Sequence, residues 1–459
     1  MSGVGAVTTP RPLVEQVADL VWDARERGHS PLVRARAAVC TAHALHCAVA
    51  GRDLPWSLIA TGLSEHVGAG PATGWADGRR LPVEEAAFVN AALAQSTLAE
   101  DMHAPSLSHP GSVVVSAALA VGEQVGADGA ALRDAVVAGY DVMCVLGSQL
   151  KTKHFTARGF RPSGVFGPLG AATAAALLLD LDRDGLAAAI GIAASTSGGL
   201  REWANAGSTD VFFHNAFAAR NGIRAAELAA AGVTGPSTVL EGAAGLAQAF
   251  AGERAAATGL ADRWRSGSGV LEVYFKRHPA CGAVQSVITL VGGLAQTHRF
   301  ELADVESATV RTHAHGTTNP GCDYAGPWGS VTQAQMSNQM AFALAVETGG
   351  HPTVSDYRRH DDPEIRDAAG LVSVVEDPWC TEVYPAESRA RVEIILTDGR
   401  HIASELSGGA ELTDDDVYVT AEQTFADAYG VTRAAQLVRG LRDLDDVANV
   451  ADLTALMRR

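Results

Sequence analysis

Two long stretches of the chain are apolar on nearly every helical face. Residues 130–150 (AALRDAVVAGYDVMCVLGSQL) and 167–182 (GPLGAATAAALLLDLD) have the spacing of helices but almost no polar stripe. A helix that is apolar all round has to be buried between other elements. Their many Ala and Gly side chains are small enough to allow close packing. These stretches therefore predict a fold built around buried helices.

The two halves of the chain differ in their hydrophobic pattern. From residue 12 to about 265, segments rich in Ala, Leu and Val with helical periodicity alternate with Gly-, Pro- and Asp-containing loops, and no strand alternation is evident. After about residue 270, SATVRTHAH (307–315) and ARVEIILTDGRHIASEL (390–406) alternate between apolar and polar residues. Asp398-Gly399 lies inside the second run and is a strong hairpin signal.

Helical stretches return between and after these strands. We expect helices near 283–297 and 331–348. Thr413, with Asp416 three residues later, is a variant of the capping box and predicts a helix start. At 459 residues the chain exceeds what one hydrophobic core normally organises. The sequence thus predicts a mainly α protein with an all-helical domain (1–269, completed by 409–459) and an inserted α+β domain (270–408).

The charge of the chain limits its partners. It has 52 acidic against 35 basic side chains, for a net charge of −17. Nucleic acids and anionic membranes need a basic face, so neither is an expected partner. The start MSGVGAVTTPRP lacks the features of a secretory signal, and no apolar run reaches the ~20 residues of a membrane helix. We expect a cytoplasmic protein.

The cysteines do not form a recognisable metal-binding motif. The six are scattered without any CxxC pair, which argues against a zinc ribbon and many iron–sulfur sites. Buried free thiols are the default interpretation. The cysteines are Cys40, Cys47, Cys144, Cys281, Cys322 and Cys380.

Three titratable side chains gather just before a predicted helix. Asp101, His103 and His109 fall within nine residues, and His109-Pro110-Gly111 opens an Ala/Val-rich helical segment. A single loop histidine is more often a structural hydrogen bonder than a catalyst, but three such groups together favour a site. A helix N-terminus also has free N–H donors and partial positive charge, which suits an anionic substrate.

An acidic substrate needs a local basic patch in this acidic protein. The segment KTKHFTARGFRPSGVFGPLG (151–170) contains such a patch, and Lys153, His154 and Arg161 are candidates for substrate binding. Arg161 is the strongest of them because a guanidinium binds a carboxylate through two hydrogen bonds. The alternative is a solvated basic loop, since charge runs usually face water.

Later segments carry further candidates. In VYFKRHPACGAVQ (273–285), Lys276 could bind a carboxylate and His278 could move protons at the junction between the domains. Cys281 could act as a nucleophile only beside a partner that lowers its pKa, and the sequence shows none. Tyr324 lies in a Gly/Pro loop ahead of a helix and could donate a proton, although most tyrosines pack instead. His214 is as easily a buried structural histidine as a ligand.

Taken together, these segments resemble the MmgE/PrpD superfamily, which includes 2-methylcitrate dehydratase, cis-aconitate decarboxylase and iminodisuccinate epimerase. The resemblance rests on six segments in the family order along nearly the whole chain. They are HPGSVVVSAALAVGE, AGYDVMCVLG, GFRPSGVFGPLGAA, GS(x)5HNAFAARNGI followed by TGP and VLEG, KRHPACGAVQSVI, and the stretch from Pro327 to Ser337. It implies a helical domain with an α+β lid, usually a homodimer, acting on a small carboxylic acid without metal or organic cofactor.

The resemblance also implies roles for particular residues. Asp101, His103 and His109 match the loop that lines the family's active site, Lys276 matches its lysine before Pro, and Tyr324 lies in its tyrosine loop. We expect these five to be catalytic.

Three positions depart from the family pattern: Arg161 replaces a histidine, Val211 a lysine, and Gln285 a histidine. Arg161 and Gln285 remain candidates for substrate binding. Because proton carriers and a cation are lost, we expect a substrate other than the usual tricarboxylate.

The leading hypothesis is a lyase of the hydro-lyase type. His109 would take the proton beside a carboxylate, Lys276 and Arg161 would hold that carboxylate, and His103 or Tyr324 would protonate the departing hydroxyl while Asp101 orients a histidine. The same apparatus could serve an epimerase or a decarboxylase, perhaps of a specialised biosynthetic pathway. A non-catalytic binding protein is a further alternative.

Overall fold

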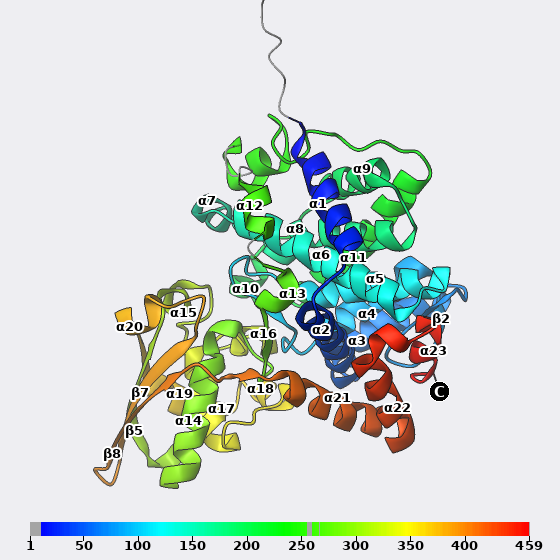
Figure 1. The fold of residues 1–459 in the computed structure, drawn as a ribbon. Coiled ribbons are helices and arrows are strands. Elements are labelled where there is room, and N and C mark those ends of the chain that lie inside the picture. The colour runs from blue at the N-terminus through cyan, green and yellow to red at the C-terminus, as the bar shows by residue number, and fades with distance from the viewer. Residues whose placement is uncertain (1–10, 255–258, 266, 459) are drawn as a thin grey trace, which may run out of the picture.

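The computed structural model describes residues 11–254, 259–265 and 267–458, and its fold is mainly α, as the sequence predicts. Figure 1 shows a large helical region joined to a smaller lobe that holds a sheet. The longer helices of the helical region are α1 (Leu13–Arg27), α2 (Pro31–Ala50), α3 (Pro55–Leu63), α4 (Val83–Gln95), α5 (Pro110–Val125), α6 (Gly129–Leu150), α8 (Pro162–Leu178), α9 (Arg183–Ala194), α11 (Val211–Ala230), α21 (Asp414–Tyr429) and α22 (Val431–Arg442). Its shorter helices are α7 (Lys153–Ala157), α10 (Trp203–Ala206), α12 (Leu260–Arg265), α13 (Gly269–Glu272) and α23 (Val450–Ala455).

Helix α8 lies at the centre of the helical region, which confirms the prediction from its all-round apolar sequence. Every residue of α8 is buried, and α5, α6, α9 and α11 pack around it. Small residues set the spacing between the helices. A Cβ on Gly222 of α11 would lie 2.4 Å from the Cβ of Ala171 in α8, closer than packed carbons approach. A larger residue at Gly222 would therefore push the two helices apart.

The last helices return to this core. Helix α21 packs on α2, and Val417, Phe425 and Leu437 join the same hydrophobic cluster as the first helices. The predicted helix start is confirmed, because Thr413 and Asp416 form a capping box at the N-terminus of α21. In Figure 1 the C-terminal helices α21 and α22 lie beside α2.

The α+β region has its own hydrophobic core and a four-stranded sheet. The strands are β5 (Val305–Thr312), β6 (Val372–Glu376), β7 (Arg389–Leu396) and β8 (His401–Ser407), in the order β6-β5-β7-β8, with only β5 and β6 parallel. The helices are α14 (Gln285–His298), α15 (Ala314–Thr318), α16 (Val331–Ala334), α17 (Asn338–Thr348), α18 (Val354–Tyr357), α19 (Pro363–Gly370) and α20 (Pro378–Thr381).

The sequence located most of these elements. The hairpin at Asp398-Gly399 is confirmed as β7 and β8, with Gly399 at φ 85°, where glycine has no steric penalty. The expected helix at 331–348 is two helices, because the backbone between α16 and α17 is not helical and Ser337 caps α17. In β7, alternate residues from Ala390 to Leu396 are buried in the core.

The first 265 residues are not entirely free of strands, contrary to the prediction. Strands β1 (Ala72–Thr73), β2 (Arg80–Leu81) and β3 (Met102–His103) are two residues each, too short to show alternation. Strand β4 (Val273–Lys276) pairs with β3 on one side and with β9 (Glu411–Leu412) on the other. This small sheet holds three distant parts of the chain together and places Lys276 beside the loop that follows α4.

None of the helices in the described residues is both long and apolar enough to cross a membrane.

Candidate active site

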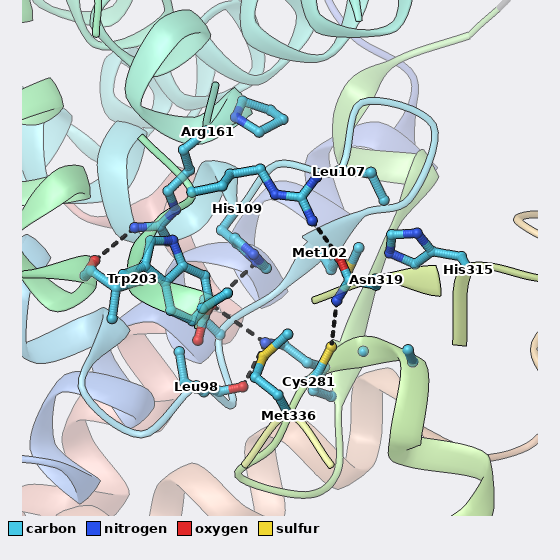
Figure 2. A pocket seen from close by; sticks show the side chains of 18 of the residues that line it. Leu98, Met102, Leu107, His109, Arg161, Trp203, Cys281, His315, Asn319 and Met336 are labelled. Carbon is cyan, nitrogen blue, oxygen red and sulfur yellow. Dashed lines mark hydrogen bonds and ion pairs between the residues drawn. The ribbon is translucent and has the colours of Figure 1, made fainter. Parts of the chain in front are cut away.

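A cavity lies where the helical region meets the α+β region. It encloses about 830 Å³ of empty space, including the part that is open to solvent. Figure 2 shows Arg161, His109 and Trp203 approaching it from the helical region, with Cys281, Asn319 and His315 on the other side. Among the predicted site residues, His109, Arg161 and Lys276 line the cavity.

His109 is held as a neutral base by the start of α5. It is the N-cap residue of this helix, its backbone N–H donates to Ser163 Oγ at 3.0 Å, and its Nδ1 lies 2.9 Å from the carbonyl oxygen of Asp101. Burial, together with the cations Lys276 and Arg161, lowers the pKa of His109 to about 4 although Glu100 opposes this. A carbonyl oxygen only accepts, so Nδ1 carries the proton and Nε2 keeps its lone pair.

Glu100 links His109 to Lys276. Its Oε1 lies 3.2 Å from His109 Nδ1 and 3.3 Å from Lys276 Nζ, and both carboxylate oxygens are buried. Burial alone would raise the pKa of Glu100, but Lys276, His109, a backbone hydrogen bond and Arg161 together more than offset this, so the pKa lies below its usual value. The angles of these ion pairs fall outside hydrogen-bond geometry, and neither oxygen accepts a regular hydrogen bond from the described residues. Glu100 therefore keeps acceptor capacity.

Lys276 is buried because β4 lies inside the small sheet. Pairing with β3 and β9 fixes its backbone, and its Nζ donates to the carbonyl oxygen of Leu98. Lys276 is 3% exposed, and its ammonium has Glu100 as its ion-pair partner. A buried ion pair of this kind holds both side chains in one geometry, since leaving either charge alone would cost several kcal/mol.

Two arginines add positive charge to the same cavity. Arg161 is the N-cap residue of α8 and donates to the carbonyl oxygen of Val211 at 2.6 Å, with its guanidinium 5.9 Å from the Trp203 ring centre. Burial lowers the pKa of Arg161 to about 10, so the side chain stays charged near neutral pH. Arg201 donates to Asn319 Oδ1. With Lys276, these cations outnumber the Glu100 carboxylate by two charges, which suits a dianionic ligand.

Asp101 and His103 do not line the cavity. The Asp101 carboxylate accepts from Gly111 N at 2.9 Å and from the Tyr140 hydroxyl at 2.8 Å, and burial raises its pKa to about 6. His103 lies between Ser106 Oγ at 2.7 Å and Glu272 Oε2 at 3.0 Å. At the N-terminus of α5, Asp101 Oδ1 therefore already accepts one of the free N–H groups, that of Gly111.

The other predicted residues also lie outside the cavity. Lys153 and His154 are exposed on α7, so this part of the basic patch faces solvent. His278 Nε2 lies 2.9 Å from Thr289 Oγ1, and burial lowers its pKa to about 3. The Gln285 side chain closes the turn after β4 by accepting from His278 N and donating to His278 O. These two side chains shape the loop that carries Cys281.

Tyr324 lies outside the cavity as well. It is 38% exposed and its hydroxyl donates to the carbonyl oxygen of Pro327 at 2.7 Å. A different tyrosine, Tyr384, lines the cavity and stacks on His313 with ring centres 3.8 Å apart.

Sequence reasoning missed several residues of the cavity. Glu100 and Arg201 carry charge, and His315, Asn319 and Tyr384 supply neutral polar groups. Burial lowers the pKa of His315 to about 4, with Arg201 adding to this, so it is neutral at pH 7. The adjacent acids at 100–101 and the HAH sequence at 313–315 were visible signals. In the described residues, no group of three or more His, Cys, Asp or Glu is arranged to hold a metal ion.

Comparison with known proteins finds similarity along most of the chain. A model of the MmgE/PrpD N-terminal domain matches residues 15–258, and one of the MmgE/PrpD C-terminal domain matches residues 278–408. Cis-aconitate decarboxylase from Aspergillus terreus is 25% identical over 441 residues, covering 89% of this chain and 88% of the relative. The cis-aconitate decarboxylase-like protein oryM from Aspergillus oryzae is 23% identical over 447 residues, covering 90% of each chain. The similarity therefore includes both regions that border the cavity.

Proposed function

The chain belongs to the MmgE/PrpD family, and from that premise we propose that it is a lyase that dehydrates a small hydroxy carboxylic acid. Relatives named as decarboxylases of an organic acid support an enzyme that acts on a small acid. The observation that carries the proposal is His109, a neutral imidazole with its Nε2 available in a cavity of net positive charge. Each step of the proposed reaction is assigned below to a side chain of this protein.

The cavity favours a ligand with two negative charges and an apolar carbon skeleton. Arg161, Arg201 and Lys276 exceed Glu100 by two charges, so two carboxylates would balance the cavity. Aromatic and aliphatic side chains, Phe160, Trp203 and Met336 among them, form much of the remaining lining. A tricarboxylate would leave one carboxylate without a cation. This supports a substrate other than the family's usual tricarboxylates.

In the proposed reaction, His109 Nε2 takes the proton from the carbon beside a carboxylate. The Lys276 ammonium stabilises the enediolate that forms, and Glu100, 3.2 Å from Nδ1, stabilises the imidazolium. Tyr384 then donates its proton to the departing hydroxyl. Burial raises the pKa of Tyr384 above its usual value, so the phenol is protonated at neutral pH and has a proton to donate.

Proton NMR in D₂O tests this function. Purified protein is mixed with a panel of small hydroxy and unsaturated acids, and deuterium incorporation beside the carboxylate is followed together with product signals. We expect exchange and dehydration with the wild type and loss of both in His109→Gln. His154→Gln is the matched control, since His154 is exposed outside the cavity. Equal exchange in wild type and His109→Gln would overturn the role of His109, and no exchange with any acid would favour a binding protein.

Decarboxylation is the second candidate, favoured by the names of the relatives. Carbon dioxide would leave in place of hydroxide, and the resulting carbanion would take a proton from the cavity. The same NMR samples separate the two reactions, because dehydration keeps every carbon of the substrate whereas decarboxylation releases one as carbon dioxide.

We further propose that the chain works as a homodimer. Leu58, Ile59 and Leu63 on α3 are each more than half exposed, which supports a face that another copy covers. Light scattering on the purified protein tests this, and a monomer mass at micromolar concentration would refute it.

A further inference from the structure

Cys281 differs from every other cysteine of the chain. All six cysteines lie in the described residues, and Cys281 is the one that is not buried. It follows the turn after β4 and lines the cavity. Free thiols inside a hydrophobic core are inert, whereas a partly exposed thiol in an electropositive site can react.

Hydrogen-bond donors surround the Cys281 sulfur. The Cys322 thiol and the backbone N–H of Ala283 lie beside it and favour its charged form. The Asn319 amide nitrogen lies 3.2 Å from Cys322 Sγ and 4.0 Å from Cys281 Sγ. Arg201 in turn donates to Asn319 Oδ1, which fixes the orientation of that amide. The residues that hold the sulfur therefore come from three separate segments.

These donors and two cations favour the thiolate. The neighbouring Cys322 thiol lowers the pKa of Cys281 to about 7 although the surrounding side chains partly desolvate the sulfur, and Ala283 N–H, Lys276 and Arg201 make smaller contributions. The pKa of Cys322 is raised instead, because its proton is shared with the neighbouring sulfur. This partner of Cys281 could not be recognised from the sequence, because Cys322 is far from Cys281 along the chain.

The cavity beside Cys281 has unpaired polar groups that call for a ligand. The Gln95 side chain is fully buried, lines the cavity and has no hydrogen-bond partner on either amide atom among the described residues. Buried polar groups normally find partners, so a bound molecule with donors and acceptors would complete this site.

We propose that Cys281 is a covalent modification site that takes small carboxylates bearing an electrophilic carbon, namely α,β-unsaturated and α-halo acids. With an unsaturated acid, the thiolate sulfur bonds to the β-carbon and the π electrons move to the α-carbon as an enediolate beside the cations. A proton then adds to that carbon, so the acid is incorporated whole. With an α-halo acid, the sulfur displaces halide. Neither step needs an oxidant.

The site does not depend on the proposed dehydration. It needs only the thiolate and an anion-binding cavity. If the product of the enzyme is an unsaturated acid, however, accumulated product would alkylate Cys281 and slow turnover.

Paired alkylating reagents test the proposal on the full-length protein. Iodoacetate is an anion and iodoacetamide is neutral, so their relative rates report local charge. We expect iodoacetate to label Cys281 about tenfold faster than iodoacetamide, because the cations concentrate the anion. Peptide mass mapping identifies the labelled residue, and Cys281→Ser should lose the label. Acrylate should add to the same residue with the mass of the intact acid.

Two further measurements guard against a variant that fails to fold. Succinate should slow iodoacetate labelling of the wild type, since it competes for the same cations. Arg201→Gln should remove most of the iodoacetate preference, whereas Arg158→Gln, an exposed arginine outside the cavity, should keep it. Labelling on another cysteine, or iodoacetamide reacting as fast as iodoacetate in the wild type, would overturn the proposal. Fast iodoacetate labelling of Cys281 without deuterium exchange into any acid would support the modification site and contradict the proposed dehydratase activity.

Discussion

The two walls of the cavity carry different chemistry. The wall from the helical region and its small sheet holds the charged Arg, Lys and Glu side chains: Glu100, Arg161, Arg201 and Lys276. The wall from the α+β region holds neutral donors and a thiol: Cys281, His315, Asn319 and Tyr384. Buried charges are costly to hold, and these side chains have fixed partners: Lys276 pairs with Glu100, and the two arginines donate to Val211 and Asn319. In the mechanism that we propose, the charged wall would bind the substrate and the neutral wall would complete the reaction.

The largest contrast we expect is between one histidine from each wall. His109→Gln should lower kcat by about 10²–10⁴, roughly 3–5 kcal/mol of barrier, because a general base is lost. His315→Gln on the neutral wall should lower kcat by less than about tenfold. Steady-state kinetics with the acid found by NMR measures both variants. Equal losses would mean that the two walls share the proton transfer.

The next effect concerns the pH dependence of stability. The pKa of His109 is about 4 in the folded protein and ~6.5 in an unfolded chain, so between these values only the unfolded chain binds the proton. The free energy of unfolding should therefore fall as pH drops from 6.5 to 4, with His109 contributing about 3 kcal/mol. Urea unfolding at pH 6.5 and at pH 4 measures this. Between these two pH values, the difference in the free energy of unfolding between the wild type and His109→Gln should change by that amount. Parallel pH curves would show that His109 is already solvated.

A smaller effect separates cavity arginines from surface arginines. Arg161→Gln should lower kcat/KM by about 10- to 100-fold, since a charge-assisted hydrogen bond to a carboxylate contributes about 1.5–3 kcal/mol. Arg158→Gln is the matched control, because this arginine is exposed on the same segment. Kinetics at low and high ionic strength check both variants. If the two lose activity equally, the effect comes from the loop and not from the charged wall.

The smallest effect concerns Tyr324. Tyr324→Phe removes a half-exposed hydrogen bond to Pro327 and should change activity less than about twofold and stability by less than about 0.5–1 kcal/mol. Tyr384→Phe, on the neutral wall, should lower kcat at least about tenfold if its hydroxyl protonates the leaving group. The reverse ranking would restore the catalytic role that the family resemblance implies for Tyr324.

Much of the fold was predictable because its signals are local. The all-round apolar segment of α8, the turn at Asp398-Gly399 and the cap at Thr413 each depend on residues a few positions apart. The strands of two residues were missed because a period cannot appear in so short a segment.

The candidate site was predictable only in part. His109 and Arg161 were found because each lies directly before a helix in a conspicuous segment. Glu100, next to the predicted Asp101, was missed because sequence cannot tell which of two adjacent acids faces a cavity. Asp101 serves instead to satisfy Gly111 and Tyr140 at the start of α5.

By itself, the sequence determined the helical class, the hairpin, the helix starts and the family to which the segments belong. Only the tertiary structure decided which side chains meet in the cavity. Lys276 reaches Glu100 through the pairing of β4 with β3, His103 is held by Glu272, and Cys281 meets Cys322. These contacts join residues far apart in the chain, so they depend on how whole helices and strands pack. A local sequence pattern does not predict how distant elements pack against one another.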